Sequence, residues 1–290
     1  RSGTVRLPHW VCDSGERMNQ TPVAPSATSP YAGYSFWLET CGEDLAPRLP
    51  LDGSIDVDVA ILGAGYTALW TAYYLLKREP SLRVAIIERR IAGFGASGRN
   101  GGWCSSKLNI SLDAVAEMYG RERAQALQRA LYDTVDEIGR VCAAERIDAG
   151  FARVGALFVA RFPYQAGMMR EYAGMFERFG FGDRQGLLSA AETGRRVRVK
   201  GALGAWHCPQ YAHLQPARLA RGLARVVERL GGRIFCGTRA AHEPGRDGPR
   251  RTAGELLGDA GGGSGHQRGL GIGRRGEKDH DQHGGFAHTN

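Results

Sequence analysis

Three small residues and one carboxylate have the types and spacing to hold a dinucleotide. Gly63 and Gly65 lie in a tight turn after an apolar run, and Ala68 stands where a third glycine often stands. Gly63 permits the sharp turn, Gly65 lets the backbone approach a pyrophosphate, and Ala68 is small enough for close helix–strand packing. Glu88 ends a second apolar run, where a carboxylate can bind both hydroxyls of a ribose.

The segments around the turn predict the elements that such a site needs. Residues 57–62 and 84–87 are apolar and rich in β-branched side chains, and residues 66–77 follow a helical pattern. The order strand, turn, helix, strand is that of the dinucleotide-binding βαβ unit. Amides of Gly65–Thr67 open the helix, where the positive end of its dipole favours a phosphate. The alternative is an ordinary strand–turn–helix with a packing glycine, which would not need the acid at this distance.

A glycine-rich segment, GFGASGRNGG at residues 93–102, follows the acid directly. Glycines there let backbone amides approach an extended ligand, and Arg99 and Asn100 add donors. A nicotinamide dehydrogenase of the simple repeating type would continue into another helix instead. The segment therefore favours FAD over NAD, and a flexible surface loop is the alternative.

Composition narrows the classes of function. The net charge is +8, but the basic residues are scattered and form no stripe with interleaved aromatics, so no nucleic-acid partner is expected. No apolar run is long enough to span a membrane, and the N-terminus has no signal-peptide pattern. The cysteines form no CxxC pair and predict reduced, mostly buried thiols of a cytoplasmic protein. Their positions are Cys12, Cys41, Cys104, Cys142, Cys208 and Cys236.

The two ends differ from the middle. Residues 1–54 read as an N-terminal extension and arm, with Met18 as the natural start and the aromatic stretch 31–41 packed on the body. Residues 241–290 are rich in glycine and histidine and too poor in apolar side chains to offset the entropy of ordering. They predict a disordered tail or a shifted reading frame, and the second is favoured. The histidine spacing matches no structural zinc site, so no metal is expected.

The pattern predicts an α/β fold with a Rossmann-like parallel sheet, whose βαβ unit and glycine loop occupy 55–102. An incomplete α+β substrate region is inserted at 103–215. Ser189 and Glu192 form a capping box, and Pro209–Gln215 reads as a loop. Residues 216–240 are expected to return as a helix and a third parallel strand.

The mid-chain histidines, His207 and His213, could each act as a base. Neither has a partner motif, so a packed or surface role is favoured and no catalytic residue is assigned.

Several stretches together resemble a known family. VDVAILGAGYTALWTAYYLL and IIERRIAGFGASGRNGGW are similar to FAD-dependent oxidoreductases of the D-amino-acid oxidase superfamily. The resemblance is nearest to the glycine/D-amino-acid oxidase-like branch that includes gamma-glutamylputrescine oxidases. YSFWLET and HLQPARLARGLARVVERLGGRIF also resemble that branch, so the likeness runs from about residue 31 to 239.

The resemblance implies FAD and a set of residues that hold it. The pyrophosphate would lie on Gly63, Ala64, Gly65, Tyr66, Thr67 and Ala68. Glu88 would bind the ribose, with Arg89 beside the adenine. The route to the flavin ring would be lined by Ser97, Arg99, Asn100, Gly101 and Gly102. The family reaction transfers hydride from the carbon beside an amine or amino-acid nitrogen to flavin N5, and oxygen or another acceptor takes the electrons.

The chain also departs from the family pattern. In the family, the later part of the chain completes the substrate sheet and returns to the flavin, and nothing after residue 240 resembles either segment. The sequence therefore predicts weak or absent FAD binding and impaired activity. An NAD-dependent dehydrogenase and a non-catalytic nucleotide-binding fragment are the alternatives.

Overall fold

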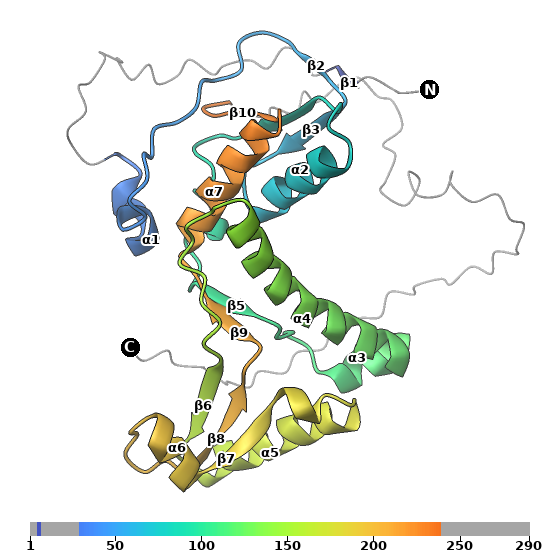
Figure 1. Ribbon diagram of the computed structural model, residues 1–290, viewed down its shortest axis with the longest axis vertical. Helices are drawn as coiled ribbons and strands as arrows, with labels where there is room; N and C mark the ends of the chain where they lie inside the picture. The colour runs from blue at the N-terminus through green and yellow to red at the C-terminus, as the bar shows by residue number, and fades with distance from the viewer. Residues whose placement is uncertain (1–4, 7–28, 239–290) are drawn as a thin grey trace, which may run out of the picture. The chain divides into compact units, whose positions relative to one another are not determined.

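The computed structural model describes residues 5–6 and 29–238 (Figure 1). Contacts divide the chain into two units, Arg1–His242 and Glu243–Asn290. The predicted start at Met18 and the predicted tail at 241–290 lie outside the described residues. In the part of the chain that is described, no helix is both long and apolar enough to cross a membrane.

A three-stranded parallel sheet forms the nucleotide-binding region. Its strands are β3 (Val59–Leu62), β4 (Val84–Ile87) and β10 (Arg233–Phe235), in the order β10-β4-β3. The predicted return is observed, because β10 pairs with β4 in parallel and follows the helix α7 (Pro216–Arg229). All four residues of β4 are buried, as expected for a central parallel strand with both faces covered.

Alternation along β4 sends its side chains into two different cores. Val84 and Ile86 pack in the larger one, together with residues of α7 and of α2 (Tyr66–Arg78). Ala85 and Ile87 face the other way, against Leu51 and Val57. The sheet is thus held between two apolar layers, which fixes the turn after β3 beside the end of β4.

The region between β4 and α7 is built mainly from antiparallel strands and helices. Strands β5 (Trp103–Ser105) and β9 (Tyr211–His213) pair with each other. Strands β6 (Ala156–Ala160), β7 (Gly186–Ser189) and β8 (Gly204–Cys208) form a sheet in the order β6-β8-β7. The helices are α3 (Leu112–Tyr119), α4 (Arg121–Ala144), α5 (Pro163–Arg178) and α6 (Ala190–Arg196), with a 3-10 turn η4 (Gly182–Arg184).

One predicted loop in this region is wrong. Pro209–Gln215 contains β9, whose residues pair with Trp103–Ser105 far away in the sequence. A three-residue strand leaves too short a pattern to recognise without its partner. The capping box is confirmed, since Ser189 Oγ accepts from the Glu192 amide at 3.2 Å and the Glu192 carboxylate accepts from the Ser189 amide at 2.8 Å.

The N-terminal arm packs on the body as predicted. It contains η2 (Ala32–Tyr34) and α1 (Phe36–Glu39), and Leu38 and Cys41 are buried against α7. Gln215 Nε2 donates to the Trp37 carbonyl at 2.6 Å, and Arg218 Nε donates to the Cys41 carbonyl at 2.7 Å. After the arm, β2 (Asp56–Val57) pairs with β1 (Val5–Arg6) in antiparallel fashion.

Candidate cofactor site

The turn between β3 and α2 has the backbone geometry that the glycines predict. Gly63 has φ of +84°, which few residues other than glycine adopt, and its amide donates to the Ile87 carbonyl at 2.8 Å. Gly65 is the N-cap of α2. A Cβ at Gly65 would lie 3.0 Å from Ser97 Oγ, so the turn and the glycine loop approach each other closely at this point.

The first amides of α2 are available to an anion. The first hydrogen bond inside the helix joins the Leu69 amide to the Gly65 carbonyl at 3.0 Å. The Tyr66 amide donates to Ser97 Oγ at 2.9 Å, whereas the amides of Thr67 and Ala68 have no acceptor among the described residues. Free amides at the positive end of a helix dipole are suited to a phosphate.

Glu88 is fixed beside these amides. Its Oε2 accepts from the Ala64 amide at 2.7 Å, and its Oε1 accepts from the Arg90 amide at 2.8 Å. Its backbone amide donates to the Phe235 carbonyl on β10 at 2.8 Å. A carboxylate has about four lone-pair sites, so Glu88 can still accept from both hydroxyls of a ribose.

The glycine loop is folded on itself, with the 3-10 turn η3 (Ala96–Gly98) inside it. The Gly93 amide donates to the Ala64 carbonyl at 2.9 Å, which ties the loop to the first turn. Asn100 Nδ2 donates to the Ser97 carbonyl at 3.1 Å, and its Oδ1 accepts from the Gly102 amide at 2.9 Å. The Asn100 amide therefore shapes the loop, a role that sequence reasoning did not give it.

Arg90 is better placed than Arg89 to face a ligand. Arg89 is exposed, whereas the Arg90 guanidinium lies over the Phe94 ring, 5.0 Å from its centroid. Arg90 Nε is buried and has no hydrogen-bond partner among the described residues. Arg99 lies over the same ring at 4.8 Å. The sequence has two consecutive arginines here and contains no signal that tells which of them turns inward.

A cavity of about 450 Å³ adjoins the end of the glycine loop. Asn100 and Gly101 lie on its wall, together with Trp70 and Trp103. Tyr66 also lines it and donates its hydroxyl to the Pro216 carbonyl at 2.9 Å, and burial raises the pKa of that hydroxyl. Of the predicted site residues, this cavity brings together Tyr66 from α2 with Asn100 and Gly101 from the loop.

The two mid-chain histidines do not form an acid–base pair. His207 Nε2 lies 3.2 Å from an Arg196 guanidinium nitrogen, and burial together with this charge lowers the pKa of His207. His213 is exposed on β9. Among the described residues, neither imidazole makes a hydrogen bond or ion pair with a carboxylate.

Comparison with known proteins identifies relatives of this fold. Residues 58–264, more than half of the chain, match the family described as FAD dependent oxidoreductase. The match continues past residue 240, where the sequence resemblance was expected to end. A gamma-glutamylputrescine oxidoreductase from Escherichia coli (strain K12) is 33% identical over 190 residues, covering 66% of this chain and 44% of the relative.

A second relative and two solved structures are also similar to this chain. A probable oxidoreductase from Rhizobium meliloti (strain 1021) is 30% identical and covers 76% of this chain and 49% of its own length. L-Amino acid deaminase from Proteus myxofaciens in complex with anthranilate has a TM-score of 0.52 at 16% identity, covering 67% of this chain and 41% of that one. The enzyme of the same name from Proteus vulgaris has a TM-score of 0.50 at 20% identity, over 66% and 43% of the two chains.

These likenesses have a defined extent. The chain spans about half the length of the relatives that it matches. The solved structures, at this identity, show the fold alone. The predicted resemblance to gamma-glutamylputrescine oxidases is confirmed, and the family match decides between FAD and the nicotinamide alternative. This chain belongs to the family of FAD-dependent oxidoreductases, and the cofactor of that family is FAD.

Proposed function

We propose that the described chain supplies the adenosine- and pyrophosphate-binding part of an FAD-dependent oxidoreductase that acts on the C–N bond of an amine or amino acid. The observation that carries this proposal is the position of Glu88. Its carboxylate lies 2.7 Å from the Ala64 amide, beside the unpaired amides of Thr67 and Ala68. A diol acceptor beside an anion-binding helix end matches a ribose and its pyrophosphate.

In this proposal each part of the ligand has its own contacts. The turn Gly63–Gly65 gives room for the pyrophosphate, and the amides of Thr67 and Ala68 face it. Glu88 accepts from the ribose hydroxyls, and Arg90 takes the adenine side that was first assigned to Arg89. Ser97, Arg99 and the run from Asn100 to Gly102 line the route onward. FAD, when bound, supplies the electron sink for amine oxidation, and the chain orients it.

We also propose that this chain by itself holds FAD weakly. Among the described residues, β3 pairs only with β4, and Leu62 at its end is 61% exposed. In the part of the chain that the structure describes, one edge of the nucleotide sheet is therefore open beside the turn that would hold the pyrophosphate. We further propose an amine or amino acid as the substrate, and oxygen or another compound as the electron acceptor. We also propose a cytoplasmic location, which fits the described cysteines, because all of them are free and buried.

The test is nucleotide binding by matched glutamate variants. Glu88→Gln removes a charge-assisted acceptor for the ribose, so its affinity for ADP should fall about tenfold, the effect of roughly 1.5 kcal/mol. Glu79→Gln changes an exposed acid at the C-terminal end of α2 and should leave the affinity unchanged. Isothermal titration of the purified chain measures both.

The two outcomes separate the competing roles. Equal ADP affinity in Glu88→Gln and the parent chain would contradict the proposed contact between Glu88 and the ribose. Dye reduction by amines then distinguishes an active oxidoreductase from a nucleotide-binding chain without catalysis. An amine-dependent rate in the presence of FAD supports the first role, and binding without any such rate supports the second.

A further inference from the structure

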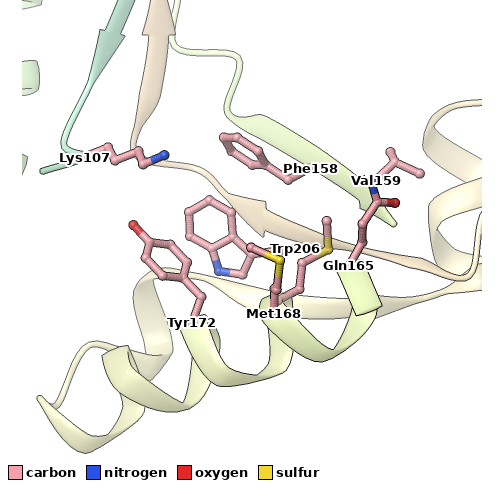
Figure 2. A pocket seen from close by; sticks show the side chains of 8 residues that line it. Lys107, Phe158, Val159, Gln165, Met168, Tyr172 and Trp206 are labelled. Atoms are coloured by element: carbon pink, nitrogen blue, oxygen red, sulfur yellow. The ribbon is translucent and has the colours of Figure 1, made fainter. Parts of the chain in front are cut away.

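A second cavity lies away from the glycine loop, between α5 and the sheet of β6 and β8, and has a volume of about 430 Å³ (Figure 2). We propose that it binds a small carboxylate with a flat, apolar body. Volumes of this size are typical of sites for small molecules. Its lining residues are Lys107, Phe158, Val159, Gln165, Met168, Met169, Tyr172 and Trp206.

Aromatic rings and thioethers make the apolar part of the cavity. The Trp206 ring is 5.0 Å from the Phe158 ring and 5.1 Å from the Tyr172 ring, centroid to centroid. Met168 and Met169 lie on the α5 side, and Met168 is 63% exposed. Flat rings with unbranched, polarisable methionines beside them adapt to a planar hydrocarbon group.

Polar groups in the cavity wall are left without partners. Trp206 is only 3% exposed, yet its indole N–H has no acceptor among the described residues. A buried donor of this kind is costly unless something accepts from it. The hydroxyl of Tyr172 and the ammonium group of Lys107 also make no hydrogen bond or ion pair within the described ranges 5–6 and 29–238.

The charge of the cavity selects the class of ligand. In Figure 2 the Lys107 ammonium and the Tyr172 hydroxyl point toward the same side of the Trp206 ring. None of the described residues that line the cavity carries a carboxylate side chain. One cation and one hydroxyl in the same lining match a single carboxylate, and the same cation would repel an amine of equal size. The site therefore distinguishes ligands by charge at one end and by shape at the other.

A series of three probes with one body tests this proposal without flavin. The probes are 3-phenylpropionate, its uncharged amide and 3-phenylpropylamine. The carboxylate should bind about threefold to fivefold more tightly than the amide, the effect of a partly exposed ion pair. The amine should bind more weakly than both. NMR spectra of labelled methionine methyl groups in the purified chain show where a probe binds. Met168 and Met169 line the cavity, while Met118 lies on α3 and serves as the reference.

Two lysine variants complete the test. Lys107→Gln should bring carboxylate affinity down to that of the amide and leave amide affinity unchanged. Lys200→Gln, at another exposed lysine, should change neither. The proposal is overturned if the three probes bind equally, if none shifts the Met168 and Met169 signals, or if Lys107→Gln and Lys200→Gln behave alike. Because no probe needs FAD, these results are independent of the nucleotide test.

Discussion

The nucleotide-binding region and the aromatic cavity are built in different ways. In the first, backbone groups make the decisive contacts, such as the Ala64 amide to Glu88 and the Gly93 amide to the Ala64 carbonyl. In the second, the side chain of Lys107 and side chains from α5, β6 and β8 meet only after folding. Backbone-made sites need particular residues at fixed spacing, so they leave a sequence pattern, whereas assembled sites leave none.

The largest expected effect on ADP binding comes from adding a side chain at Gly65, where the backbone must come close to the pyrophosphate. A side chain there would meet Ser97 Oγ at 3.0 Å and occupy the space in front of the α2 amides. Gly65→Val should weaken ADP binding by at least about thirtyfold, equivalent to roughly 2 kcal/mol of overpacking. Equilibrium titration measures the loss.

A matched glycine controls for the general cost of adding valine. At Gly186 in β7, an added Cβ would meet no other atom within 4 Å, and valine suits a strand. Gly186→Val should keep both the fold and the ADP affinity. If Gly65→Val binds ADP as well as this control does, the pyrophosphate does not lie on the turn.

A smaller effect should separate the two consecutive arginines. Arg90→Gln removes a half-buried guanidinium that lies over Phe94, and ADP affinity should fall about fivefold, or roughly 1 kcal/mol. Arg89→Gln changes an exposed side chain and should have no measurable effect. Equal losses in the two variants would contradict the assignment of the inward position to Arg90.

These arginines show where sequence reasoning stopped. The βαβ unit, the glycine turn and Glu88 followed from spacing, because each depends on local backbone needs, and the return strand β10 followed from the helix-then-strand pattern at 216–240. Side-chain direction just after a strand depends on what packs nearby, so Arg90 could not be chosen over Arg89. Strand β9 was missed for a related reason, since its partner β5 is distant in sequence.

The same limit applies to the cavity residues. Met169 and Tyr172 read as one apolar side of a helix, which is what a core helix also shows. Lys107 carries no sequence signal, since an exposed lysine is ordinary. Only the fold places it beside Phe158 and Trp206. Apolar residues at helical spacing along α4 do not all face the core either, because Val135 and Cys142 are buried while Leu127 is exposed.

The smallest expected effect concerns an ion pair that joins the starts of β3 and β4. Hydrogen bonds from the Arg83 side chain and backbone amide lower the pKa of Asp58 from 3.8 to about 2. A depressed pKa means that the pair stabilises the fold above the unfolded pKa and that this contribution is lost as the pH falls from about 4 to about 2. The pair is exposed, so the effect should be small.

Asp58→Asn should therefore lower stability slightly near pH 6 and make no difference near pH 2. Urea unfolding at a series of pH values measures the difference between the two chains. Asp52→Asn, which removes an acid without an ion pair in the described part of the chain, is the control. A difference for Asp58→Asn that stays constant from pH 6 to pH 2 would contradict the linkage.

The most direct test of the nucleotide site compares ADP and FAD on the same purified chain. The described residues supply contacts for adenosine and pyrophosphate, which the two ligands share, so the two affinities should agree within about threefold. FAD that binds at least about a hundredfold more tightly than ADP, or copurifies in stoichiometric amount, would show that the chain also holds the flavin ring. That result would contradict the account, and so would the absence of binding by either ligand.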